Sequence, residues 1–334
     1  MIYKIAVIGA GSWGTALARL VSDNGHLVNI FDINQETIDE INNFHTNKSK
    51  LPNGILNENV RGTTNLNEAV NWSDIILLAV PTKVIRSVLE EIASVIKTKK
   101  LFVNASKGIE PKTYKRVSEI VYEVIDHKYI DGFVALTGPS HAEEVILQML
   151  TSVTAASEDI SKSLIVQKIF SNKTYFRVYA LNDLIGAELG GSLKNIIAIA
   201  SGMLAGLGYG DNARAALVTR GLVEMQKLSI ALGAKDKTLF GLTGLGDLVV
   251  TCFSEHSRNF QAGKKIASGK NLQKALSEMT MVVEGVRSCE AAYFESKDLG
   301  IETPIIDAVY DVLFNQTSPK KAVSRLMQRS LKEE

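Results

Sequence analysis

Two lysines stand at positions where a lysine could take part in catalysis. Lys107 lies in Asn104-Ala105-Ser106-Lys107-Gly108, directly after an apolar run typical of a strand. Ligands of parallel sheets bind outside the carboxyl ends of the strands. Lys194 lies in an otherwise apolar, small-residue stretch with helical periodicity, residues 188–198. Burial there would lower the pKa of its ammonium group toward the working range of a proton donor, so Lys194 is the candidate acid–base residue. The alternative is a lysine that extends its charge to solvent from a helix edge.

A second polar cluster is Ser257-Arg258-Asn259. It follows the glycine-rich segment 241–247 and precedes a helical pattern. Serine caps helices, and an arginine guanidinium binds phosphate or carboxylate through two parallel hydrogen bonds. The three residues therefore form a candidate clamp for an anionic substrate, although a capped helix with a surface arginine explains the same pattern. Asp247, which ends the glycine-rich segment, could orient a lysine or cap a helix.

A third cluster consists of Gly9, Gly11 and Gly14, spaced as G-x-G-x-x-G. The spacing alone is weak, but here it lies between a predicted strand and a predicted helix, which is the context of a dinucleotide-binding turn. Gly9 allows the tight turn, Gly11 lets the backbone approach a pyrophosphate, and Gly14 lets the helix pack close to the strand. The pyrophosphate would then lie on backbone N–H groups at the helix N-terminus.

Asp32 ends the second predicted strand, where an acidic residue usually binds the ribose 2′-hydroxyl of NAD. The next residues, Ile33, Asn34 and Gln35, offer no cation for the 2′-phosphate of NADP. This pattern favours NAD. Two alternatives stay open: Asp32 could cap the helix that begins near Asn34, and a basic residue from elsewhere could accept NADP.

The elements that must position these residues alternate in the first half of the chain. Residues 13–24 and the stretch that begins at residue 82 have helical periodicity. Strands are predicted at residues 4–8, 27–32, 74–80, 101–105, 133–137 and 152–157. Such alternation predicts an α/β Rossmann domain with a doubly wound, mostly parallel sheet, and we assign it residues 1–182. Residues 183–334 contain long amphipathic stretches and predict an all-α substrate and catalytic domain. Residues 48–65 are predicted to be a surface loop.

Composition excludes several classes of protein. The chain of 334 residues is 46% hydrophobic, enough for more than one domain. The 37 basic and 36 acidic residues leave a net charge of +1, which gives no general attraction to nucleic acid. The sequence begins in a strand pattern without the features of a signal peptide, and no uncharged apolar run reaches the roughly 20 residues of a membrane span. We therefore expect a cytoplasmic protein.

Metal and disulfide chemistry are not expected. The two cysteines, Cys252 and Cys289, form no framework and have no C-x-x-C spacing. The histidines are scattered without a pair spaced for zinc. They are His26, His45, His127, His141 and His256.

Taken together, these residues resemble the bacterial-type NAD(P)-dependent glycerol-3-phosphate dehydrogenases over essentially the whole chain. The resemblance rests on residues 9–17, 106–110, 137–142, 188–198, 212–217, 244–248, 256–259 and 282–285. It implies interconversion of sn-glycerol 3-phosphate and dihydroxyacetone phosphate, which supplies glycerol 3-phosphate for phospholipid synthesis. One departure concerns the cofactor: the family commonly has a basic residue or a histidine just after the second strand, and Asp32-Ile33-Asn34 has neither. A strong preference for NADP is therefore not expected.

The resemblance also implies residue roles. Lys194 would be the acid–base residue, with help from Lys107. The implied substrate contacts are Lys107, Gly138, Ser140, Lys194, Asn195, Asp247, Ser257, Arg258 and Asn259. With the glycine turn and Asp32, the implied cofactor contacts are Ser12, Trp13, Lys107, Ala142, Arg258, Val282 and Glu284. The apolar second half could also build the interface of a homodimer.

Two other functions remain open on the sequence. A 3-hydroxyacid dehydrogenase or related ketoacid reductase also joins a Rossmann domain to a helical domain that carries a lysine. A non-catalytic regulator that binds a dinucleotide would share the glycine turn, but it would not need Lys194 in an apolar helix. Activity on dihydroxyacetone phosphate separates the three.

Overall fold

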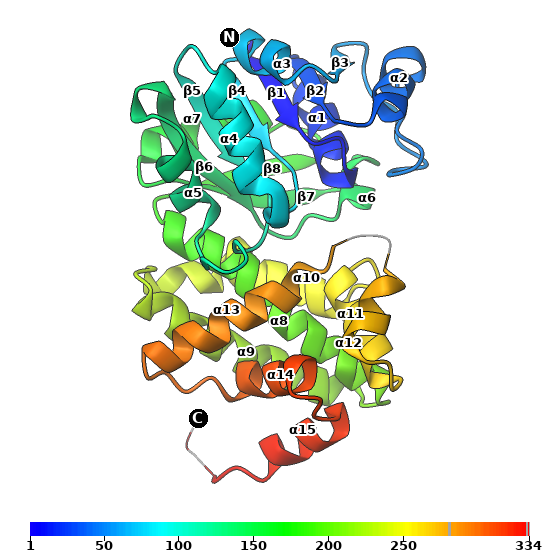
Figure 1. Cartoon of the computed structure of the whole chain (residues 1–334), viewed down its shortest axis with the longest axis vertical. Coiled ribbons are helices and arrows are strands. Elements are labelled where there is room, and N and C mark those ends of the chain that lie inside the picture. Colours follow the sequence, from blue (N-terminus) through cyan, green and yellow to red (C-terminus); the bar gives the residue numbers. More distant parts are fainter. Residues whose placement is uncertain (280–281, 332, 334) are drawn as a thin grey trace. The chain divides into compact units, whose positions relative to one another are not determined.

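The computed structural model describes residues 1–279, 282–331 and 333, and the chain divides into two compact units (Figure 1). The first comprises Met1–Glu110 and Lys115–Glu188, and the second comprises Pro111–Tyr114 and the described residues from Leu189 onward. The predicted domain boundary after residue 182 stays a prediction.

A single eight-stranded sheet forms the centre of the first unit. Its strands follow the order β3-β2-β1-β4-β5-β6-β7-β8. All neighbouring strands run parallel except β6 and β7, which are antiparallel. The strands are β1 (Lys4–Ile8), β2 (Leu27–Phe31), β3 (Val60–Thr63), β4 (Ile75–Leu78), β5 (Lys100–Asn104), β6 (Ile130–Thr137), β7 (Thr151–Ala156) and β8 (Phe176–Leu181). The mostly parallel sheet predicted from the sequence is confirmed.

Helices cover both faces of this sheet. They are α1 (Ser12–Asp23), α2 (Gln35–Phe44), α3 (Leu66–Trp72), α4 (Ile85–Val95), α5 (Val117–Val124), α6 (Ala142–Val145) and α7 (Ile160–Phe170). Alternate residues of a strand point to opposite faces. Ile5 and Val7 accordingly join one buried cluster, which includes Leu17 of α1, while Ala6 and Ile8 join another, which includes Leu89 of α4. The sheet is doubly wound, as the sequence predicted.

Two edge strands, β3 and β8, were not predicted from the sequence. The prediction of a surface loop over residues 48–65 is wrong at its end, because Val60–Thr63 forms β3 and pairs with β2. Only Val60 of these four residues is buried, so the strand has almost no apolar pattern. Strand β8 was not predicted either. It pairs with β7 on one side only, and Arg177 and Tyr179 on it are exposed.

In the described part of the second unit, all regular structure is helical, which confirms the predicted all-α region. The helices are α8 (Leu184–Gly206, whose residues up to Glu188 belong to the first unit), α9 (Asp211–Ala231), α10 (Asp247–Phe253), α11 (Arg258–Ala267), α12 (Leu272–Ser277), α13 (Glu284–Asp298), α14 (Pro304–Phe314) and α15 (Pro319–Met327). A π-helical turn at Leu242–Gly246 and a short 3-10 helix at Asp236–Phe240 complete them. Helix α8 is long and apolar enough to cross a membrane by length and composition, but 89% of its most apolar window is buried inside the fold. It carries Glu188 and Lys194, and such burial is typical of a core helix.

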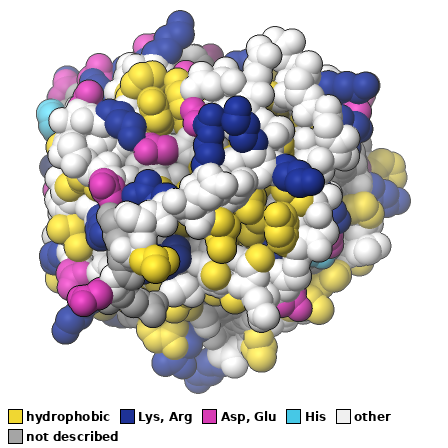
Figure 2. Space-filling view, turned by 90° about the horizontal axis from the view of Figure 1, so that it is seen from below, with side chains coloured by type: hydrophobic (Ala, Val, Ile, Leu, Met, Phe, Trp, Pro, Cys, Tyr) yellow, Lys and Arg dark blue, Asp and Glu magenta, His cyan; other side chains and the backbone are white. Residues whose placement is uncertain are grey.

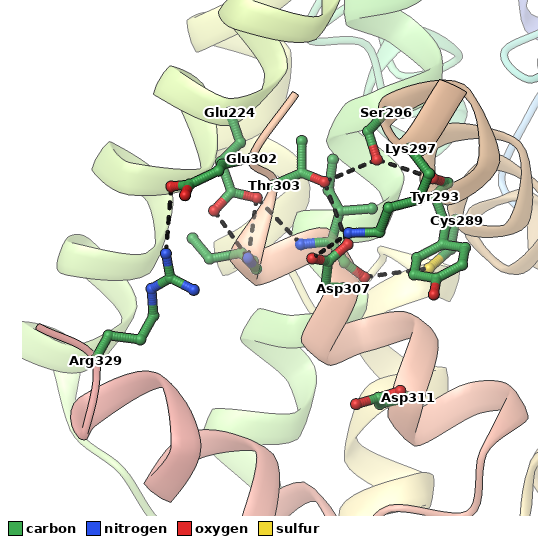
Figure 3. Close-up of polar contacts among 12 residues, drawn as sticks. Glu224, Cys289, Tyr293, Ser296, Lys297, Glu302, Thr303, Asp307, Asp311 and Arg329 are labelled. Carbon is green, nitrogen blue, oxygen red and sulfur yellow. Dashed lines mark hydrogen bonds and ion pairs between the residues drawn. The ribbon is translucent and has the colours of Figure 1, made fainter. Parts of the chain in front are cut away.

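A buried carboxylate joins two helices of this unit. Glu224 of α9 accepts hydrogen bonds from the backbone N–H of Ile305, at 2.8 and 3.0 Å, and of Ile306, at 3.1 Å (Figure 3). These N–H groups belong to the first turn of α14, where a helix has no internal acceptors for its donors and favours negative charge. Burial nevertheless raises the pKa of Glu224 from 4.5 to about 7.

Charged side chains of both signs lie on the surface. Figure 2 shows basic, acidic and apolar side chains interspersed on the face seen from below. Among the side chains coloured by type there, neither sign of charge gathers into one field. This mixture is what a net charge of +1 leads one to expect.

Candidate functional site

The glycine turn joins β1 to α1 in the geometry that the sequence predicted. Gly9 has φ +107°, and a Cβ there would lie 2.9 Å from Cγ1 of Val80. A Cβ on Gly14 would overlap the carbonyl oxygen of Gly9, at 2.0 Å, so the helix can approach the strand only with glycine at this position. A Cβ on Gly11 would meet nothing within 4 Å, and no side chain caps α1. Open space therefore lies beside the first-turn donors of α1.

The Asp32 carboxylate holds this turn. One oxygen accepts a hydrogen bond from the backbone N–H of Ala10, at 2.8 Å, and the other accepts from the N–H of Asn34, at 3.0 Å. Helix α2 is capped by Asn34, whose side chain accepts from the N–H of Thr37. Asp32 is thus not the cap of α2, and that alternative reading is wrong.

Asn47 supports the same turn and was missed by the sequence analysis. Its buried side-chain Nδ2 donates to the carbonyl of Ala10, at 2.8 Å, and to Oγ1 of Thr15, at 2.9 Å. A single asparagine before a polar loop has no recognisable sequence signal. The predicted cofactor residues Ser12 and Trp13 lie in the first turn of α1. The Ser12 hydroxyl donates to the carbonyl of Lys50, and Nε1 of Trp13 is buried with no hydrogen-bond partner among the described residues.

Lys107 meets the chain that follows β6. Its Nζ donates to the carbonyl of Gly138, at 2.8 Å, and to the hydroxyl of Ser140, at 3.3 Å. Strands β5 and β6 are parallel neighbours, so the residues after their carboxyl ends lie at one edge of the sheet. The structure therefore brings together Lys107, Gly138 and Ser140, with Ala142 at the start of α6. Two predicted substrate contacts are partners of the same ammonium group.

Lys194 is buried, with 5% of its surface exposed. Its Nζ lies 2.6 Å from Oδ1 of Asp247, which is only 1% exposed, and 2.7 Å from Oγ1 of Thr251. The alternative of a lysine extended to solvent is therefore wrong. A buried ammonium group costs several kcal/mol unless it is paired and hydrogen-bonded, so this arrangement needs both partners.

Thr251 contacts Lys194 but was not predicted from the sequence as a site residue. It lies four residues after Asp247 on α10, and the two side chains share a helix face. The spacing was visible in the sequence, but a threonine in an apolar helix is not distinctive by itself. Thr251 also donates its hydroxyl hydrogen to the carbonyl of Asp247, at 2.5 Å, so its oxygen lone pairs face Lys194.

Close packing of α8 against α11 brings further predicted residues together. A Cβ on Gly202 of α8 would lie 2.0 Å from the carbonyl oxygen of Phe260, and one on Gly263 of α11 would lie 2.1 Å from that of Ile199. At this crossing, Asn259 of α11 donates through Nδ2 to Oδ1 of Asn195, at 2.8 Å. Glycine at the two contact positions is what allows this distance between the helices.

The clamp residues begin α11 as predicted. Ser257 is the N-cap, and its side chain accepts from the N–H of Phe260. Arg258, in the first turn, is exposed. The predicted cofactor residues Val282 and Glu284 lie just before and at the start of α13, whose Gly285 donates its N–H to Oδ1 of Asn259, at 2.9 Å.

The described residues form no metal site, and both cysteines are free thiols. Among the described residues, no group of three or more His, Cys, Asp or Glu side chains could hold a metal ion. Cys252 and Cys289 are free and buried. Burial raises the pKa of the Cys252 thiol to about 12, so it stays protonated beside the Lys194–Asp247 pair.

These observations fit a dinucleotide in the first unit. A bound pyrophosphate would fit the open space beside Gly11 and accept hydrogen bonds from the uncapped N-terminus of α1. The cofactor could also accept a hydrogen bond from the orphaned Nε1 of Trp13. The second unit supplies a buried, paired ammonium group and a helix N-terminus next to an arginine. Each unit, taken by itself, therefore holds groups of the kind that hydride transfer to an anionic substrate requires.

Comparison with known proteins identifies the family. The family models described as NAD-dependent glycerol-3-phosphate dehydrogenase N-terminus and C-terminus match residues 4–163 and 183–324. A curated relative from Staphylococcus epidermidis, named glycerol-3-phosphate dehydrogenase [NAD(P)+], is 49% identical over 99% of both chains. The crystal structure of glycerol-3-phosphate dehydrogenase from Coxiella burnetii matches with a TM-score of 0.92 and 34% identity, over 98% of this chain and 99% of the other. Glycerol-3-phosphate dehydrogenase from Plasmodium falciparum, at 23% identity, shares the fold with a TM-score of 0.90 over 99% of this chain and 97% of the other. The chain belongs to the NAD-dependent glycerol-3-phosphate dehydrogenase family.

Proposed function

We propose that this chain interconverts sn-glycerol 3-phosphate and dihydroxyacetone phosphate with NAD(H) or NADP(H). The observation that carries the proposal is the buried Lys194 ammonium group, held by Asp247 at 2.6 Å and Thr251 at 2.7 Å. A purely structural helix has no use for a buried cation, because an apolar residue of similar size would cost less. The proposal is supported by a relative, 49% identical over 99% of this chain, that is named glycerol-3-phosphate dehydrogenase [NAD(P)+].

In the reductive direction, Lys194 is the proton donor. When bound, the reduced nicotinamide supplies the hydride that adds to C2 of the ketone. Lys194 gives an Nζ proton to the C2 oxygen, so the product gains one C–H and one O–H bond and Nζ becomes neutral until solvent reprotonates it. Asp247 and Thr251 hold Nζ in place. Lys107 supplies a second positive charge to the same oxygen, where negative charge develops.

The phosphate of the substrate needs donors and positive charge. Arg258 offers an exposed guanidinium group in the first turn of α11, and Ser257 fixes the start of that helix. Asn195, Asn259, Gly138 and Ser140 are the further contacts that we propose for the substrate.

The cofactor would be held mainly by the first unit. Gly9, Gly11 and Gly14 would receive the pyrophosphate with Ser12 and Trp13, and Asp32 would accept from a ribose hydroxyl. Lys107, Ala142, Arg258, Val282 and Glu284 are the remaining proposed contacts. A carboxylate at Asp32, followed by no basic residue, favours NAD over NADP.

The experiment that tests the function follows NADH and NADPH oxidation by absorbance, with and without dihydroxyacetone phosphate. Oxidation that depends on dihydroxyacetone phosphate supports the proposal. Turnover of a 3-ketoacid alone would instead identify a 3-hydroxyacid dehydrogenase. Binding of NADH without any turnover would identify a dinucleotide-binding regulator.

Three finer properties belong to the same proposal. We place the enzyme in the cytoplasm, at the step that supplies glycerol 3-phosphate for phospholipid synthesis. We also propose a homodimer, with its interface on the apolar second half of the chain, where Phe240, at 55%, and Met327, at 81%, are exposed. Light scattering coupled to size-exclusion chromatography measures the mass, and a monomer at micromolar concentration would contradict the dimer.

A further inference from the structure

Four buried side-chain and backbone groups of the helical unit form a chain of three hydrogen bonds that all run in one direction. The N–H of Gly285 donates to Oδ1 of Asn259, at 2.9 Å. Nδ2 of Asn259 donates to Oδ1 of Asn195, at 2.8 Å, and Nδ2 of Asn195 donates to the carbonyl of Gly191, at 3.3 Å. The chain links the start of α13 to α11 and then to α8, one residue from Lys194.

The direction of this chain follows from its two ends. A backbone N–H can only donate, so the Asn259 atom facing Gly285 must be the amide oxygen. The other end is a carbonyl, which can only accept. Each asparagine amide therefore has a single orientation that satisfies both ends, and turning either amide over would place two donors or two acceptors face to face. Both asparagines are buried, so the mismatch would not be relieved by water.

Packing holds the same three helices together. A Cβ on Gly285 would lie 2.7 Å from the carbonyl oxygen of Asn195, 2.7 Å from Oδ1 of Asn259 and 2.8 Å from Cδ1 of Ile199. Any larger residue at position 285 must therefore push the start of α13 away from α8 and α11. Val282, just before α13, and Glu284, its first residue, are two of the proposed cofactor contacts of this unit.

From these contacts we infer that the side chain of Asn259 is a positioning group that couples substrate binding to cofactor binding. Its Oδ1 and one Nδ2 hydrogen are used within the protein, so the second Nδ2 hydrogen and the main-chain N–H are the groups that would contact the phosphate. A phosphate held there would add a further hydrogen bond to the orientation of Asn259 that the chain already requires, and would make that orientation more rigid. A fixed Asn259 in turn holds Gly285 and the cofactor contacts that precede it. The inference rests on the proposed function and adds a link between its two ligands.

The test measures how much sn-glycerol 3-phosphate changes the Kd of NADH, followed by NADH fluorescence. This pair of ligands does not react, so the complex is stable during the titration. We expect saturating sn-glycerol 3-phosphate to lower the NADH Kd of the wild type by about fivefold or more, a usual size for coupling between sites. Gly285→Ala disturbs the donor end of the chain, and Asn195→Leu removes the bonds to Asn259 and Gly191. In both variants we expect less than about a twofold change.

The control is Ser288→Ala on the same face of α13. Ser288 is fully buried, and its hydroxyl has no hydrogen-bond partner among the described residues, so its loss should leave the coupling at the wild-type value. A merely structural role for the chain would lower the Tm of Gly285→Ala without altering the ratio of the two Kd values. All titrations are therefore made well below the lowest Tm.

The outcomes separate this inference from the proposed function. A wild type that reduces dihydroxyacetone phosphate, but whose coupling is absent or survives in folded Gly285→Ala, overturns the inference alone. A wild type without turnover overturns the proposed function. If Asn195→Leu does not fold, Gly285→Ala decides the question, because it touches neither ligand directly.

Discussion

Two buried charged groups of the helical unit are held in different ways. Lys194, 5% exposed, faces the side chains of Asp247 and Thr251, and a full opposite charge lies 2.6 Å away. Glu224, 6% exposed, faces backbone N–H groups of α14 (Figure 3). Backbone dipoles offset burial less completely than a counter-ion does, and the pKa of Glu224 rises to about 7. The ammonium group of Lys194 is thus held by a charged partner, whereas the contact between α9 and α14 is held by backbone dipoles and depends on pH.

The largest effect should follow loss of the paired cation. Replacing Lys194 by Ala removes the proton donor, and we expect kcat/KM for dihydroxyacetone phosphate to fall by about 10² to 10⁴. Steady-state kinetics measures this loss. Lys227→Ala, at an exposed position on α9, is the control and should keep wild-type kinetics. A loss of less than roughly tenfold in Lys194→Ala would remove Lys194 from the catalytic role.

The second prediction concerns Glu224 and the pH dependence of the protein's stability. Glu224 titrates near 4.5 when unfolded and near 7 when folded, so the folded state binds more protons between these values. Stability should therefore fall as pH rises from about 4.5 to about 7, by an amount on the order of 3 kcal/mol. Asp307 and Arg329 also face this carboxylate, with opposite effects on its pKa.

Glu224→Gln tests this sign. The amide stays neutral at every pH and its oxygen can still accept from Ile305, so the pH dependence attributed to Glu224 should disappear. Burial also shifts the pKa values of His26 and Glu188, so the informative quantity is the difference between the denaturation curves of the two proteins. If that difference stays constant from pH 4.5 to 8, Glu224 is not the responsive group.

A third change sharpens the description of the lysine site. Thr251→Val keeps the shape of the side chain and removes the hydroxyl that accepts from Lys194. A hydrogen bond to a charged group is worth about 1.5–3 kcal/mol, so we expect kcat to fall about ten- to hundredfold. Thr251→Ser retains the hydroxyl and should recover most of the rate. Equal rates for the Val and Ser variants would show that only the volume of the side chain matters.

The smallest effect is expected at Asp32, a partly exposed carboxylate that can be compared with the buried Glu224. Asp32, like Glu224, accepts from backbone N–H groups, at 2.8 Å from Ala10 and 3.0 Å from Asn34. Asp32→Asn keeps an acceptor for the turn and removes the charge. We expect the ratio of NADPH to NADH affinity to rise by about three- to tenfold, since charge repulsion at an exposed site is modest. Fluorescence titrations with both cofactors measure it, and an unchanged ratio would mean that Asp32 does not select the cofactor.

Much of the fold could be predicted from the sequence because its signals are local. Gly9 and Gly14 mark a turn whose tight contacts belong to neighbouring residues, and Ser257 caps the helix that begins right after it. The buried strands of the sheet are apolar on both faces, which is legible in short runs. The edge strands β3 and β8 lack such runs, since part of each is exposed, and they escaped prediction for that reason.

The sequence by itself determined the dinucleotide turn, the doubly wound sheet, the helical second half and the two lysines that could take part in catalysis. Only the tertiary structure decided what those lysines touch. Asp247 is 53 positions from Lys194, and Ile305 is 81 positions from Glu224. No local pattern encodes such pairs, because they exist only once remote helices pack. The same packing, with glycine at the contact between α8 and α11, brings Asn195 and Asn259 within hydrogen-bond distance.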